Sequence, residues 1–219
     1  MLKGRQIVGL LLALVAMLPL QAYSVQAEPD LTERVDEYVQ TQMARMNIPG
    51  IGLGVVADGQ AFFSQGYGVC ASGGGPVAAD TPFLLSSLTK SFTALAVMQL
   101  AEQGQVGLDD PVRTYLPWFW ENSPKASSVT VRHLLHHTSG IPTRPGLKPP
   151  KSGETMEQRA RELNQSSPSQ PAGQVFQYAN HNYVLLGLLV EKVSGLSYAD
   201  YVERYIFQPL NMDRSFTDQ

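Results

Sequence analysis

The chain has 219 residues, is 43% hydrophobic and carries a formal net charge of −3, the composition of a globular domain with a sizeable core. It shows no basic excess, so it lacks the electrostatic footprint of a nucleic-acid-binding protein and no nucleic-acid partner is expected. Its single cysteine, Cys70, excludes an intrachain disulfide.

The first 27 residues predict a secretory signal peptide. A basic start with Lys3 and Arg5 precedes an apolar run over residues 7–20, and the small residues before Glu28 suit a cleavage site. Because the apolar run is short for a membrane span, we expect cleavage and no stable membrane insertion afterwards. An uncleaved anchor is the alternative.

The next segments predict a helix that packs on a small sheet. Residues 30–46 place apolar side chains on one side of a helix. Residues 51–57 and 60–67 read as strands, and Asp58-Gly59 between them is a strong signal for a β-hairpin.

A polar pair then precedes a strongly apolar helix. Residues 88–101 are apolar on nearly every side, which predicts a helix buried all round. Ser87 and Lys90 lie three positions apart at its start, so one helical turn brings them onto the same face. A serine hydroxyl becomes a nucleophile when a neighbouring group takes its proton, and a lysine can do this or assist. The S-x-x-K pattern alone is weak evidence, since chance matches are common.

The middle of the chain predicts short helices and loops. Asp110-Pro111 suits the start of a short helix toward Tyr115, and the aromatic cluster at residues 117–120 is assigned to the core in preference to a binding cleft. Residues 141–173 are rich in Pro, Ser, Gly and Gln, with a short helix over 155–163, and we expect a variable flap near the site.

Two further chemical patterns around the histidines are considered and set aside. Thr130 is predicted to cap a helix through His137, which puts His133 and His137 on one face as in zinc sites. The H-E-x-x-H form is absent and few other histidines are available, so no metal is expected. Ser139 stands close to His137, but neighbours in a turn seldom form a Ser–His pair, and a structural corner is preferred.

A Y-x-N pattern comes next. Tyr178 and Asn180 lead into an apolar helix over residues 183–193 that Gly195 ends, and Ser197 then caps a helix over residues 198–205. A buried structural tyrosine would be the ordinary interpretation of Y-x-N alone. Its combination with S-x-x-K favours catalysis.

Four motifs carry a family resemblance. They are S-S-L-T-K-S-F-T-A (86–94), L-L-H-H-T-S-G-I-P (134–142), F-Q-Y-A-N-H-N-Y-V-L-L-G (176–187) and Q-P-L-N-M-D-R-S-F (208–216). In order and approximate spacing they resemble the class C β-lactamase and penicillin-binding-protein family of serine hydrolases. The resemblance runs from about residue 30 to the last residue, and residues 28–219 are interpreted as one such domain.

The resemblance implies an α/β fold of the α+β type, with an antiparallel sheet flanked by helices and a helical subdomain. It implies an acyl-enzyme on Ser87, with Lys90 activating, Tyr178 as the base and Asn180 orienting the substrate. Bringing a phenol from a pKa near 10 to near 7 requires roughly 4 kcal/mol of preferential stabilisation of the phenolate. The implied substrate is a β-lactam, a D-Ala-D-Ala peptide or a small ester, and no cofactor is implied. The predicted signal peptide and the family resemblance together predict a periplasmic location.

One element of the resemblance is missing. The family continues with a strand that carries K-T-G or H-x-G beside the nucleophile, and no such motif occurs here. We expect either a fragment of a longer protein, which we prefer, or a truncated homologue. The rival function is a non-catalytic protein that binds peptidoglycan-like or acyl ligands without turnover.

Overall fold

The computed structural model describes residues 29–71, 74–143, 153–161 and 168–217. The predicted signal peptide, residues 1–27, lies outside these ranges. Two compact units divide the chain, one ending at Thr81 and the other beginning at Pro82, and each is described by itself. No helix in the described ranges is both long and apolar enough to cross a membrane.

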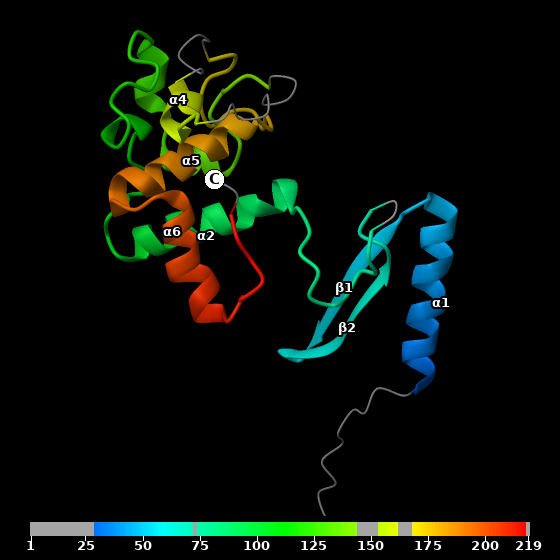
Figure 1. Cartoon of the computed structure of the whole chain (residues 1–219). Coiled ribbons are helices and arrows are strands. Elements are labelled where there is room, and N and C mark those ends of the chain that lie inside the picture. Colours follow the sequence, from blue (N-terminus) through cyan, green and yellow to red (C-terminus); the bar gives the residue numbers. More distant parts are fainter. Residues whose placement is uncertain (1–28, 72–73, 144–152, 162–167, 218–219) are drawn as a thin grey trace, which may run out of the picture. The chain divides into compact units, whose positions relative to one another are not determined.

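The first unit is a helix and a β-hairpin (Figure 1). Helix α1 covers Pro29–Met46, and strands β1 (Gly50–Ala57) and β2 (Gln60–Gly68) pair antiparallel. Asp58 and Gly59 join the strands with φ of +51° and +75°, the left-handed pair that a two-residue hairpin turn requires. The predicted helix and hairpin are confirmed to within a residue or two at each end.

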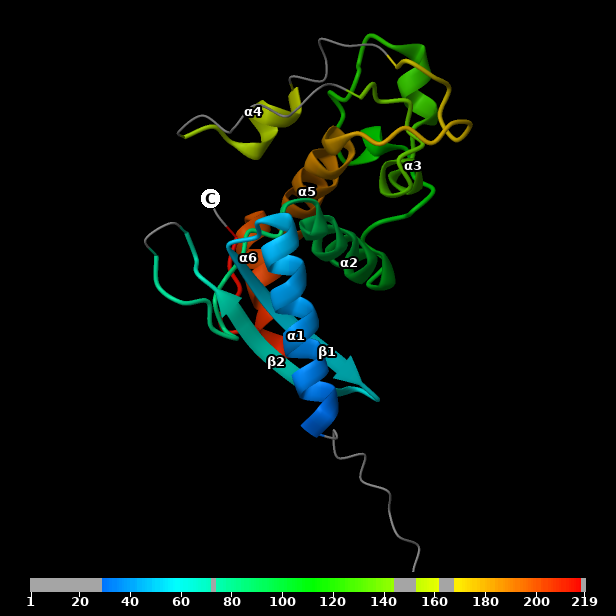
Figure 2. The ribbon, with the colours of Figure 1, turned by 90° about the vertical axis from the view of Figure 1, so that its right-hand side faces the viewer.

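Helix α1 lies along one face of the hairpin (Figure 2) and is tied to it by a polar contact. The Tyr67 hydroxyl donates to the Asp36 carboxylate over 2.5 Å. Burial, with this hydrogen bond and the charge of Asp36, raises the pKa of Tyr67 to about 12. The predicted packing of the helix on the sheet is therefore confirmed.

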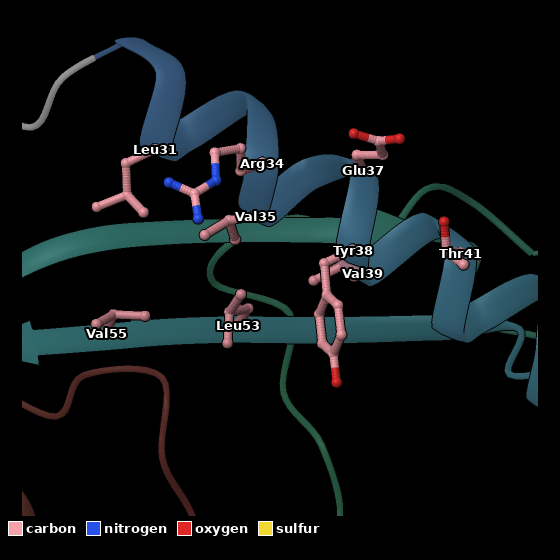
Figure 3. A pocket seen from close by; sticks show the side chains of 9 residues that line it. All are labelled: Leu31, Arg34, Val35, Glu37, Tyr38, Val39, Thr41, Leu53 and Val55. Atoms are coloured by element: carbon pink, nitrogen blue, oxygen red, sulfur yellow. The ribbon is translucent and has the colours of Figure 1, made fainter.

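An open groove of about 740 Å³ runs between α1 and β1 (Figure 3). Leu53 and Val55 of β1 form its floor, and apolar side chains of α1 form its wall. Its complete lining is Leu31, Arg34, Val35, Glu37, Tyr38, Val39, Thr41, Leu53 and Val55. It includes none of the candidate catalytic residues.

The second unit is a group of helices around α5. Helix α5 (Asn180–Ser194) is packed against α2 (Thr89–Glu102), α3 (Val131–Leu135), α4 (Met156–Arg161) and α6 (Tyr198–Val202). Its buried residues run almost without interruption from His181 to Val190. Most of the core belongs to this unit. Its largest fully buried side chains are Phe119, Leu100, Leu116, Leu134, Ile141, Leu185, Leu186, Leu188, Leu189, Ile206 and Val97.

Within the second unit, the helix after Ser87 is buried on one face only and not all round as predicted. One face of α2 is buried through Thr93, Ala96, Val97 and Leu100, while Leu95 and Met98 are exposed, as is Leu88 in the turn before the helix. Within the second unit α2 packs mainly on α5 and α6, and these neighbours cover one side of a helix only. Apolar composition indicated a core helix, but it could not say how many neighbours the helix has.

Several element ends also differ from the predictions. A 3₁₀ turn at Val112–Thr114 takes the place of the helix expected after Asp110-Pro111. Helix α3 ends at Leu135, before the predicted His137, because His137 has a φ of +56° and cannot continue a right-handed helix.

The C-terminal helices follow the predictions more closely. Gly195 ends α5 with a φ of +74°, and the Ser197 hydroxyl caps α6. A π-helical turn at Glu203–Phe207 replaces the last part of the expected helix. The aromatic cluster is confirmed as core, since Phe119 and Trp120 are buried and stacked on each other.

Candidate active site

Ser87 lies in a 3₁₀ turn, Ser86–Leu88, directly before α2. Ser86 has a φ of +49°, a left-handed conformation that costs energy for a residue other than glycine and is frequent at functional sites. Lys90 follows in the first turn of α2, and its Nζ donates to Ser87 Oγ over 3.2 Å. The predicted pairing of Ser87 and Lys90 by one helical turn is confirmed.

Tyr178 and Asn180 approach this pair from a second segment. Tyr178 ends the irregular segment before α5, and Asn180 is the first residue of that helix. The Tyr178 hydroxyl lies 2.9 Å from Ser87 Oγ, and Lys90 Nζ donates to Asn180 Oδ1 over 2.9 Å. The structure therefore brings together all four residues named from the sequence.

The electrostatics of the cluster make Tyr178 easier to ionise than an ordinary tyrosine. Hydrogen bonding from Lys90, then from Ser87, lowers the pKa of Tyr178 below its ordinary value of 10, against a smaller opposing effect of burial. Lys90 Nζ also lies 5.1 Å from the centre of the Tyr178 ring. With 40% of its surface exposed, Tyr178 is open to a ligand. A phenolate beside a serine hydroxyl can act as its base.

The backbone around Tyr178 is held by residues that the sequence did not identify as functional. The Gln177 N–H donates to the carbonyl of His137 over 2.7 Å, and the Ala179 N–H donates to His137 Nδ1 over 3.3 Å. The Thr143 hydroxyl donates to the carbonyl of Tyr178 over 2.7 Å. The sequence marked His137 by its spacing from His133, by its neighbour Ser139 and by its place in the H-T-S-G segment of a family motif, and none of these signals indicates a contact with the segment around Tyr178.

The other histidine patterns have structural roles. His133 Nδ1 accepts from the Thr130 N–H and completes a capping box at the start of α3. The Ser139 hydroxyl donates to Asn182 Oδ1 over 2.6 Å, so the prediction of a structural corner in place of a Ser–His pair is confirmed. Within the part of the chain that the structure describes, no three His, Cys, Asp or Glu side chains are grouped to hold a metal ion.

Comparison with known proteins gives matches over most of the chain. The family described as Beta-lactamase matches residues 35–219. Protein flp of Staphylococcus aureus (strain COL) is 30% identical over 195 residues, which cover 84% of this chain and 38% of flp. The chain thus spans about two fifths of the length of such curated relatives.

Solved structures give the same result. A penicillin-binding protein homologue from Pyrococcus abyssi, described as octameric, is 34% identical with a TM-score of 0.71, over 83% of this chain and 43% of that one. A class C β-lactamase in complex with cefoxitin is 28% identical with a TM-score of 0.73, over 85% and 51%. These likenesses confirm the predicted β-lactamase/transpeptidase-like fold of the α+β type. The chain belongs to the β-lactamase family, whose members among the matched structures are serine hydrolases.

Proposed function

We propose that this protein is a serine hydrolase that works through an acyl-enzyme on Ser87. One observation carries the proposal. Ser87 Oγ lies within hydrogen-bond distance of both Tyr178 OH and Lys90 Nζ, at 2.9 and 3.2 Å. This is the nucleophile–base arrangement required for covalent catalysis at a hydroxyl.

The acylation step follows from these contacts. The Tyr178 phenolate takes the proton of Ser87 as Oγ forms a bond to the carbonyl carbon of an ester or amide. The tetrahedral intermediate collapses, the bond to the leaving group breaks, and the tyrosine proton passes to the leaving oxygen or nitrogen. Lys90 stabilises the phenolate throughout, and Asn180, which holds Lys90 through Oδ1, keeps its amide available to orient a substrate carbonyl.

Deacylation uses the same groups in reverse. Water attacks the acyl carbon and gives its proton to the Tyr178 phenolate. The acyl–Oγ bond breaks, the acid leaves, and Ser87 Oγ regains a proton from Tyr178. No metal or organic cofactor enters this sequence of steps, because side chains and water supply every proton and bond.

The proposed substrate is a β-lactam, a D-Ala-D-Ala peptide or a small ester, in the periplasm after export directed by residues 1–27. The cefoxitin complex of a structural relative and the penicillin-binding homologue support an acyl donor of this kind.

The test is intact-mass detection of a covalent adduct. The full chain is incubated with a penicillin and, separately, with a fluorophosphonate, and we expect one adduct with each reagent. Ser87→Ala should abolish both adducts. Ser91→Ala, which makes the same change one helical turn away on an exposed site of α2, should leave them unchanged.

Two results would contradict the proposal. A folded wild-type chain that binds penicillin without forming an adduct would favour the rival function of ligand binding without turnover. An adduct that persists in Ser87→Ala would place the nucleophile elsewhere.

A further inference from the structure

His137 is buried beside Tyr178, and its backbone adopts a left-handed conformation that is unfavourable for a residue other than glycine. Its exposed surface is 8%, and its φ of +56° is left-handed. Its ring centre lies 4.5 Å from that of Tyr178 with an interplanar angle of 32°, and 5.2 Å from that of Tyr183. Residues other than glycine keep such a φ when the surrounding structure imposes it, which occurs often at functional sites.

The contacts of His137 define its protonation state. The backbone N–H of Ala179 can only donate, so Nδ1, which accepts from it over 3.3 Å, carries no proton. Asn182 Nδ2 lies 2.9 Å from the same Nδ1 and donates to it. The imidazole is therefore neutral, with its proton on Nε2.

A buried chain of hydrogen bonds holds Asn182 in the required orientation. The Ile141 N–H donates to Ser139 Oγ over 3.2 Å, which directs the Ser139 hydroxyl proton to Asn182 Oδ1, 2.6 Å away. With Oδ1 occupied as an acceptor, the Asn182 amide group faces His137. Backbone donors at both ends, Ile141 and Ala179, thus make Nδ1 of His137 the acceptor on which the chain converges.

His137 therefore controls the backbone on both sides of Tyr178. Its carbonyl accepts from the Gln177 N–H and its Nδ1 accepts from the Ala179 N–H, while its ring packs on the phenol between them. Resting on the proposed role of Tyr178 as the base, we propose that neutral His137 is a positioning residue that keeps the Tyr178 hydroxyl within reach of Ser87.

The proposal has a consequence for pH. Burial, then the charge of Lys90, lowers the pKa of His137 below its ordinary value of 6.5. The titratable groups that face it are Lys90 from α2, Tyr178, and Tyr183 from α5. Protonation of His137 would put a hydrogen on Nδ1, where it would face the donors of Ala179 and Asn182, and both hydrogen bonds would be lost. Acylation should then fall steeply in acid.

The first experiment measures the rate of Ser87 acylation by a fluorophosphonate in three variants of the full chain. His137→Phe keeps a ring but loses the acceptor, and we expect the rate to fall by about 10- to 100-fold, the cost of a misplaced catalytic group. In His137→Asn, Oδ1 can replace Nδ1 and Asn tolerates a positive φ, so the rate should recover to within about 5-fold of wild type. His136→Phe, the same change at the exposed neighbour, should have no effect.

The pH profile separates positioning from simple packing. In wild type the logarithm of the rate should fall by about one per pH unit below the pKa of Tyr178, and by about two per unit once His137 also titrates. His137→Asn should keep the single slope. A second slope that persists in His137→Asn would overturn the proposal, as would wild-type acylation in a folded His137→Phe.

A second measurement does not depend on turnover. The ionisation of Tyr178 is followed by absorbance near 295 nm, as the difference between each variant and its Tyr178→Phe partner. His137→Phe should raise the pKa of Tyr178 toward about 10, while His137→Asn should leave it lowered. An identical titration in all variants would overturn the inference. A wild type without any adduct would overturn the proposed function alone, because this titration still tests the role of His137.

Discussion

Lys90 is the residue that contributes most to lowering the pKa of the proposed base, Tyr178. Its hydrogen bond is the largest cause of the lowered pKa of Tyr178. A base acts in its deprotonated form, so acylation should rise with pH through that lowered pKa and then level off. In Lys90→Met the rise should move toward pH 10, measured as fluorophosphonate acylation between about pH 5 and 10. A rise at an unchanged pH would show that Lys90 does not tune Tyr178.

Tyr178 should carry the proton transfer itself. Tyr178→Phe should lower the acylation rate by about 10²- to 10⁴-fold, the usual contribution of a general base. Tyr115→Phe is the matched control, since that hydroxyl bonds to Asp110 and to the Gly107 N–H and has no contact with the cluster. Equal rates in the two variants would remove Tyr178 from the mechanism.

Helix α2 presents one buried and one exposed apolar face, and substitutions on the two faces should differ. Leu100 is 1% exposed and Leu95 is 42% exposed. Leu100→Ala should lower the free energy of unfolding by about 2 to 5 kcal/mol through a cavity, whereas Leu95→Ala should change it by about 0.5 kcal/mol. Urea denaturation followed by circular dichroism measures both. A cost for Leu95→Ala as large as that for Leu100→Ala would show that the second face is also covered in solution.

For the molecule as a whole, the stability of the unit that ends at Thr81 should depend on pH through the hydrogen bond from Tyr67 to Asp36. The pKa of Tyr67 is raised to about 12 in the folded chain and is near 10 when unfolded. The protonated phenol is the form that the fold favours. Its contribution to stability is therefore complete below about pH 10 and is lost as the pH rises toward 12.

Tyr67→Phe should lower the stability of this unit by about 1.5 kcal/mol at pH 8, since the hydrogen bond is to a charged group. Between about pH 9 and 11 the variant should also lose less stability than wild type, as measured by urea denaturation. Tyr38→Phe, at a side chain that is 65% exposed on α1, is the matched control and should behave as wild type. Equal alkaline sensitivity in wild type and Tyr67→Phe would contradict the assignment.

Local patterns predicted much of this protein. The hairpin at Asp58-Gly59 and the Ser87–Lys90 pair depend on neighbours in sequence, where turn geometry and the 3.6-residue helical repeat are sufficient. The pairing of Ser87 with Tyr178, 91 positions away, was predicted from the family resemblance of the motifs. Spacing and composition alone carry no information on such a contact.

Long-range packing decided the rest. Leu95 is exposed because α5 and α6 cover the other face of α2. The apolar pattern of the sequence shows only that a side chain is suited to burial, and it does not show which face of the helix is covered. His137 was read as a helix residue, yet its positive φ and its contacts with Ala179 and Asn182 arise only when α3 meets the start of α5. Hydrogen bonds between segments far apart in the chain follow from the packing of helices, so their partners are known only once that packing is known.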